Sequence, residues 1–147
     1  MGRVFFNTRM RIQNLTASYT CLEEDSGSTF IVLPAATTDI TLPDPSDVAE
    51  GWNCTIILQS DSGFGGDGIM DQKVNIDMTS GTANVGIIHG GDAGGSDQAV
   101  DGDDFINCTN AASPGDTFHF LTDGTRWFIT GLTIDSSECP FGTATAL

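Results

Sequence analysis

The chain has 147 residues, the size of one domain, with five basic and twenty acidic side chains and a formal net charge of -15. Val, Ile, Thr and Gly are abundant, whereas Lys occurs once and Glu four times, a composition that favours strands and turns and excludes a helical bundle. The negative charge excludes most roles on nucleic acids or anionic membrane surfaces, because phosphate groups would be repelled.

Residues 1–18 are predicted to form an extended N-terminal arm. All twenty acidic residues follow residue 22, so the arm has a charge of +3 and the rest of the chain a charge of -18. The aromatic side chains of the arm need an outside surface on which to be buried. We interpret five side chains as a partner-binding anchor: Arg3, Phe5, Phe6, Arg9 and Arg11.

Residues 19–134 are predicted to form a single all-β domain. Short runs of β-branched and aromatic residues alternate with Gly, Pro, Asp, Asn and Ser at a spacing of about 8–12 residues. This spacing is typical of an antiparallel β-sandwich or barrel, such as a jelly-roll-like fold. The runs are 19–22, 29–33, 39–42, 52–60, 73–78, 85–89, 105–108, 117–122 and 126–134.

Two local features are predicted between these strands, a short helical turn and a tight hairpin. A short helical turn is predicted near residues 45–50, where Asp44 can cap the first amides and Pro45 suits the first helical position. A hairpin is predicted around Asp123-Gly124, a pair that accepts the positive φ angles of a two-residue type I′ turn. Residues 135–147 are predicted to be a C-terminal tail.

Few residues could support catalysis. The two histidines are His89, at a strand end, and His119, which strand alternation places on the face opposite Phe118 and Phe120. Neither is accompanied by a nucleophile, metal or nucleotide motif, so we expect no enzymatic activity. A small hydrolase remains an alternative, and it would need one histidine in hydrogen-bond reach of a carboxylate.

Metal and disulfide sites are also weakly supported. The Asp- and Gly-rich loop 90–104 is the best Ca²⁺ candidate, but it has no bidentate Glu at the required place, and we expect neither a metal nor another cofactor. The four cysteines have no CxxC spacing, and their disulfide state is open: Cys21, Cys54, Cys108 and Cys139. Trp52 and Trp127 could form a sugar-binding platform, but their strand neighbours favour the core or a subunit interface.

Four stretches, 19–33, 40–45, 51–57 and 123–131, resemble a β-rich module of tailed viruses, both bacteriophages and archaeal viruses. In that family, similar modules occur in capsid decoration (cement) proteins, head fibres and tail fibres. The resemblance implies a virion structural protein that is made in the host cytoplasm and binds the outside of the major capsid protein lattice, generally as a homotrimer. The negative charge, rather than the resemblance, is the reason that we expect no nucleic acid or membrane partner. The alternative within this family is a receptor- or glycan-binding module of a fibre or tail.

Overall fold

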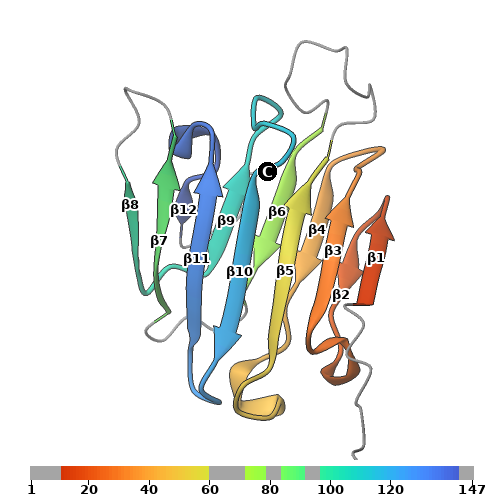
Figure 1. Cartoon of the computed structure of the whole chain (residues 1–147), viewed down its shortest axis with the longest axis vertical. Helices are drawn as coiled ribbons and strands as arrows, with labels where there is room; N and C mark the ends of the chain where they lie inside the picture. The colour runs from red at the N-terminus through yellow and green to blue at the C-terminus, as the bar shows by residue number, and fades with distance from the viewer. Residues whose placement is uncertain (1–10, 60–71, 79–83, 92–96, 143–147) are drawn as a thin grey trace, which may run out of the picture.

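Two mixed β-sheets pack face to face as a sandwich (Figure 1). The computed structural model describes residues 11–59, 72–78, 84–91 and 97–142. The larger sheet has the strand order β1-β3-β5-β10-β11-β7-β8, and the smaller has the order β12-β9-β6-β4-β2. This architecture confirms the predicted all-β sandwich.

Every predicted run overlaps a strand, while β1, β8 and β12 lie outside these runs. The seven-stranded sheet contains β1 (Arg11–Leu15), β3 (Ser28–Val32), β5 (Asn53–Leu58), β7 (Val85–Gly90), β8 (Gln98–Asp101), β10 (Thr117–Thr122) and β11 (Trp127–Thr133). The five-stranded sheet contains β2 (Tyr19–Thr20), β4 (Thr38–Thr41), β6 (Val74–Asp77), β9 (Phe105–Cys108) and β12 (Phe141–Gly142). Three short 3₁₀ turns are η1 (Glu23–Asp25), η2 (Pro45–Asp47) and η3 (Ser136–Glu138).

The sheets are mixed, whereas the sequence spacing predicted antiparallel pairing of a jelly-roll-like kind. Strands β1 to β6 alternate between the two sheets, so each strand lies parallel to the strand two before it in the chain. Strand β10 then pairs antiparallel with both β5 and β11, and β11 pairs parallel with β7. Turn spacing locates strands, but the sheet that each strand joins is decided by the packing of the whole chain.

The core lies between the sheets and is built by strand alternation. Phe118 and Phe120 of β10 are fully buried, while His119 between them is exposed, as predicted. Trp52 and Trp127 pack edge to face in this core, with ring centroids 5.4 Å apart. Both indoles are buried, so neither provides the exposed sugar platform considered above.

The predicted helical turn is confirmed as η2, where the Asp44 carboxylate accepts a hydrogen bond from the Ser46 amide at 2.9 Å. The β10–β11 hairpin is also confirmed, but its loop is longer than the predicted two residues. Thr122 lies opposite Trp127, which leaves four residues, 123–126, in the turn. The Asp123 carboxylate accepts hydrogen bonds from the amides of Thr125 and Arg126, so an Asx-type turn closes the hairpin.

The sandwich extends beyond the predicted arm and tail boundaries. Residues 11–15, assigned to the arm from the sequence, form β1 and pair in register with β3. Residues of the predicted tail form η3 and β12, and Cys139 between them is fully buried. The body of the molecule therefore includes the end of the arm and the beginning of the tail.

Candidate binding face

The outward side of the seven-stranded sheet forms three rows of side chains that run across the strands in register. The central row is Ile12, Thr29, Thr55, His119, Thr130 and Ile87. The second row is Asn14, Ile31, Ile57, Thr117, Leu132 and His89. The third row is Asn53, Leu121, Phe128 and Val85. We call these residues the uncharged face, because none is Asp, Glu, Lys or Arg.

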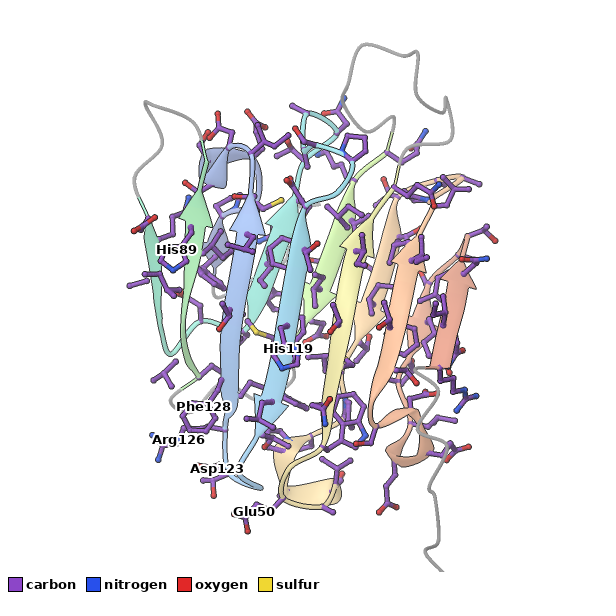
Figure 2. All side chains as sticks on the ribbon, viewed as in Figure 1. Glu50, His89, His119, Asp123, Arg126 and Phe128 are labelled. Carbon is purple, nitrogen blue, oxygen red and sulfur yellow. The ribbon has the colours of Figure 1, made fainter. Side chains whose placement is uncertain are left out.

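Large apolar side chains on this face are open to solvent. Ile12 is 62% exposed and Leu132 is 61% exposed, while Leu121 and Phe128 lie opposite each other and are 40% and 39% exposed. Ile134, which follows β11, is 58% exposed. An exposed apolar surface of this kind is typical of a protein contact site. Figure 2 shows His119 and Phe128 on adjacent strands of this sheet.

The opposite side of the sandwich differs in charge. On the five-stranded sheet, Asp39 lies beside Asn75, and Asp77 follows two residues later on the same outer side. Glu50, Asp123 and Arg126 lie at the end of the molecule, beyond the strands of the uncharged face (Figure 2). Carboxylates are thus present on the other sheet and at one end, while six strands of the larger sheet present none outward. Apart from Asp97, which lies beside His89 at one margin of the face, covering these residues requires no desolvation of a carboxylate or ammonium group.

The two histidines have different surroundings on this face. His119 Nδ1 lies 3.2 Å from the Thr55 hydroxyl, a hydrogen bond within the central row. His89 Nδ1 lies 3.2 Å from a carboxylate oxygen of Asp97, and both of these side chains are about half exposed. His89 therefore meets the geometric condition set for the hydrolase alternative.

A hollow of about 410 Å³ lies beside His89, at the end of β7 and β11. Its polar side chains include Asp116, whose carboxylate is buried and accepts hydrogen bonds from the Ile134 and Ser113 amides. Burial raises the pKa of Asp116, and these two bonds offset only part of that effect. The Thr133 hydroxyl donates to the His89 carbonyl oxygen at 3.3 Å. Among the described lining residues, no Ser, Cys or Lys is available as a nucleophile.

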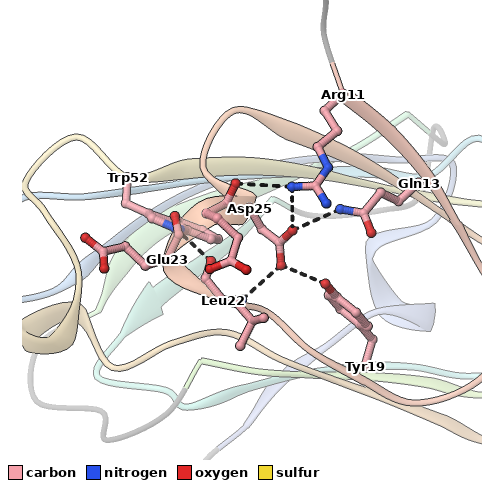
Figure 3. A network of polar contacts seen from close by, with 8 residues as sticks. Arg11, Gln13, Tyr19, Leu22, Glu23, Asp25 and Trp52 are labelled. Carbon is pink, nitrogen blue, oxygen red and sulfur yellow. Dashed lines mark hydrogen bonds and ion pairs between the residues drawn. The ribbon is translucent and has the colours of Figure 1, made fainter.

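Arg11 is the one residue of the predicted anchor whose position is described. Its guanidinium lies 3.3 Å from the Asp25 carboxylate and donates to the Glu24 carbonyl oxygen (Figure 3). Arg11 thus holds β1 against η1, although its side chain remains 54% exposed. The other four anchor residues lie outside the described part of the chain: Arg3, Phe5, Phe6 and Arg9.

The Asp25 carboxylate organises this corner of the sandwich. It accepts hydrogen bonds from the Gln13 amide, the Tyr19 hydroxyl and the Leu22 backbone amide at 2.8–2.9 Å (Figure 3). Burial raises the pKa of Asp25, but these hydrogen bonds and the Arg11 charge outweigh burial, so the pKa lies below the ordinary value. Nothing in the sequence distinguishes Asp25 from the two glutamates before it.

The candidate Ca²⁺ loop is only partly described, since residues 92–96 fall outside the described ranges. Within the described part, Asp97 pairs with His89, and the Asp103 carbonyl oxygen accepts a hydrogen bond from the Asn84 side chain. No group of three or more potential metal ligands occurs among the described residues of the chain.

The exposed apolar residues of the uncharged face were not identified from the sequence. A signal for them does exist in β11, where inward Trp127 and Ile129 alternate with outward Phe128 and Leu132. A strand that is apolar at both parities indicates burial on both sides. In this chain, the outer side of β11 is open at Leu132, which no described residue covers.

No protein-family model and no curated protein matches the chain. Among the described residues, no helix is long and apolar enough to span a membrane.

Proposed function

We propose that the chain is a capsid decoration (cement) protein, a virion structural protein that binds the outside of the major capsid lattice of a tailed virus. The observation that carries this proposal is the uncharged face, which spans six strands of a chain with a net charge of -15. Interface centres are depleted of charged residues and contain exposed apolar side chains, as this face does. A β-sandwich with such a face acts by binding a large partner and needs no catalytic step.

Decoration stabilises a shell by mass action. A protein that binds the assembled lattice more tightly than free subunits lowers the free energy of the assembled state. The proposal includes display as a homotrimer on the virion surface, after synthesis in the host cytoplasm. Arg3, Phe5, Phe6 and Arg9 would add a second attachment point, because they precede β1, the edge strand of the seven-stranded sheet, in the sequence.

The test places one charge in the uncharged face. Leu132→Asp adds a carboxylate at an exposed position of β11 on the uncharged face, where the side chain makes no contribution to the inner core. We expect at least about a tenfold loss of affinity, since burying an unpaired charge costs more than 1.4 kcal/mol. The measurement is the number of copies retained on capsids assembled from the major capsid protein of the same virus.

The matched control is Thr20→Asp, which adds the same charge at an exposed position of β2 on the other sheet. Both variants should keep the melting temperature of the parent chain, because both side chains are exposed. Full retention of Leu132→Asp on capsids, or equal loss of both variants, would refute attachment through the uncharged face.

A receptor- or glycan-binding module is the second candidate function, and the hollow beside His89 favours it. The apolar side chains of Leu132 and Ile134 and the polar pair His89–Asp97 line or border this hollow. Such a mixture suits a small polar ligand with one apolar side. Binding on a glycan array that is lost in Asp97→Asn, with no retention on capsids, would support this candidate over the decoration protein.

A further inference from the structure

Cys108 and Cys139 lie directly opposite each other in neighbouring antiparallel segments. Phe141 of β12 is paired with Ile106 of β9. The same register continues beyond β12, because the Asn107 amide donates to the Pro140 carbonyl oxygen at 2.9 Å and the Thr109 amide to that of Glu138 at 2.8 Å. These two hydrogen bonds flank Cys108 and Cys139 on either side.

Two residues flanked in this way form a non-hydrogen-bonded pair, in which the Cα atoms are about 4.5 Å apart. Disulfides span Cα separations of roughly 4.4–6.8 Å. The register therefore brings these two cysteines within the range of a disulfide without a large movement of either backbone.

The side chains of the pair point the same way. Cys108 is 1% exposed and Cys139 is fully buried, which places both sulfurs on the inner side of the five-stranded sheet. A hydrogen bond between the two thiols, together with burial, raises the pKa of Cys139 above its ordinary value. Both thiols are free in the structure.

We infer that Cys108 and Cys139 form a cross-strand disulfide when the protein meets an oxidising environment. The bond would fasten η3 and β12 to β9, where β12 is an edge strand of only two residues. It would also close a covalent loop that contains β10 and β11, the strands that carry His119, Phe128 and Leu132 of the uncharged face. This inference does not depend on the proposed function.

The oxidant in the proposed reaction is a small disulfide, such as glutathione disulfide. One cysteine thiolate attacks a sulfur of that disulfide, which breaks the S–S bond and releases one glutathione thiolate. The second cysteine thiolate then attacks the protein sulfur of the mixed disulfide and releases a second glutathione. Two cysteine protons are lost, and the two electrons reduce glutathione disulfide to two thiols.

Access to the buried thiols requires local opening of β12. This opening is expected to need little free energy, because β12 is a two-residue strand at the edge of its sheet. Since the thiolate is the attacking species and an exposed cysteine has a pKa of about 8.5, oxidation through the opened state should accelerate as the pH rises. It should also accelerate at denaturant concentrations that leave the rest of the sandwich folded.

The experiment uses the unmodified chain, incubated with glutathione disulfide, blocked with N-ethylmaleimide and digested with trypsin without reduction. Trypsin cleaves after Arg11, Lys73 and Arg126 and so separates the cysteines into three peptides. Peptide 12–73 contains Cys21 and Cys54, peptide 74–126 contains Cys108, and peptide 127–147 contains Cys139. We expect one linked species that joins 74–126 to 127–147 and separates on reduction. Recovery of Cys108 and Cys139 as singly blocked thiols, or linkage of either to peptide 12–73, would overturn the inference.

Stability provides the second readout. Closing the loop between Cys108 and Cys139 should raise the melting temperature by about 10 °C, and reduction should reverse the rise. Cys139→Ala should abolish both the linked species and the rise. The matched control is Cys54→Ala, which removes another buried thiol and should retain both. A rise that persists in Cys139→Ala would assign the effect to a different bond.

Discussion

At the scale of single residues, Asp25 connects β1 with η1 and Tyr19. Its carboxylate is 1% exposed and receives hydrogen bonds from Gln13, Tyr19 and the Leu22 amide, with Arg11 at 3.3 Å. We predict that Asp25→Asn destabilises the fold by about 2 kcal/mol, because an amide offers only one acceptor oxygen and no charge. The exposed Arg11 contributes less than a buried cation would, since solvent screens it.

Urea unfolding measures this loss, and Asp47→Asn is the control, because it makes the same change at an exposed carboxylate of η2. A control loss within about 0.5 kcal/mol is expected for such a surface position. Equal stability of Asp25→Asn and the parent chain would mean that this network does not stabilise β1.

The same carboxylate predicts a pH dependence. The folded pKa of Asp25 lies below the value of about 3.9 of an unfolded aspartate, so the unfolded state takes up a proton first as the pH falls. The contribution of Asp25 is therefore fully present above that value and is lost as the pH falls through the folded pKa. The difference in unfolding free energy between the parent and Asp25→Asn should narrow in acid.

Tyr19 gives an independent readout of the network. Its hydrogen bond to Asp25, with burial and the Asp25 charge, raises the pKa of Tyr19 to about 12. The chain contains one tyrosine, so the ultraviolet absorbance of the phenolate reports this group alone. In Asp25→Asn, the midpoint should fall toward the ordinary value of about 10. An unchanged midpoint would show that Asp25 does not accept from Tyr19.

At the scale of elements, β1 belongs to the sandwich, whereas the sequence predicts an extended partner-binding arm for these residues. It pairs with β3 over all five of its residues and buries Leu15. We predict that deletion of residues 1–15 lowers the unfolding free energy by about 3 kcal/mol, through loss of the buried leucine and of donors to Asp25. It should also promote self-association, because β3 becomes an open edge.

The matched truncation removes residues 1–10 and keeps β1. Under the proposed function, it should leave the urea midpoint unchanged and weaken retention on capsids, because Arg3, Phe5, Phe6 and Arg9 are lost. Size-exclusion chromatography and urea titration of both truncations separate the structural role of β1 from the anchoring role of the preceding segment. If the two truncated proteins were equally stable, β1 would make no measurable contribution to the stability of the sandwich.

At the scale of the whole molecule, charge is the dominant property. A net charge of -15 on one small domain produces self-repulsion that opposes the compact state. We predict that the melting temperature at neutral pH rises by several degrees between about 0.01 M and about 1 M NaCl, over which the Debye length falls from about 30 Å to about 3 Å. Repeating the titration near the isoelectric point of about 4.1 is the control, since the salt effect should nearly vanish there.

The positions of most strands, and the faces of the residues in 117–122, were predictable from the sequence because their signals are local. Alternation in 117–122 is sufficient to bury Phe118 and Phe120 and to expose His119. The Asp44-Pro45 pair is sufficient to predict η2. The hairpin loop was predicted two residues too short, but a shift of two keeps every side chain on its face, so the inner and outer sets remained correct.

The sequence by itself therefore determined an acidic, all-β molecule, the position of most strands and, in 117–122, the side of the sheet that each residue faces. Only the tertiary structure decided which strands are neighbours, because pairing depends on how distant segments pack. In the folded chain, Thr55 lies beside His119 in the uncharged face, Cys108 lies opposite Cys139, and Arg11 lies 3.3 Å from Asp25. Strand alternation repeats every two residues and can be seen within one segment, whereas each of these contacts joins residues from different segments and forms only when the sandwich closes.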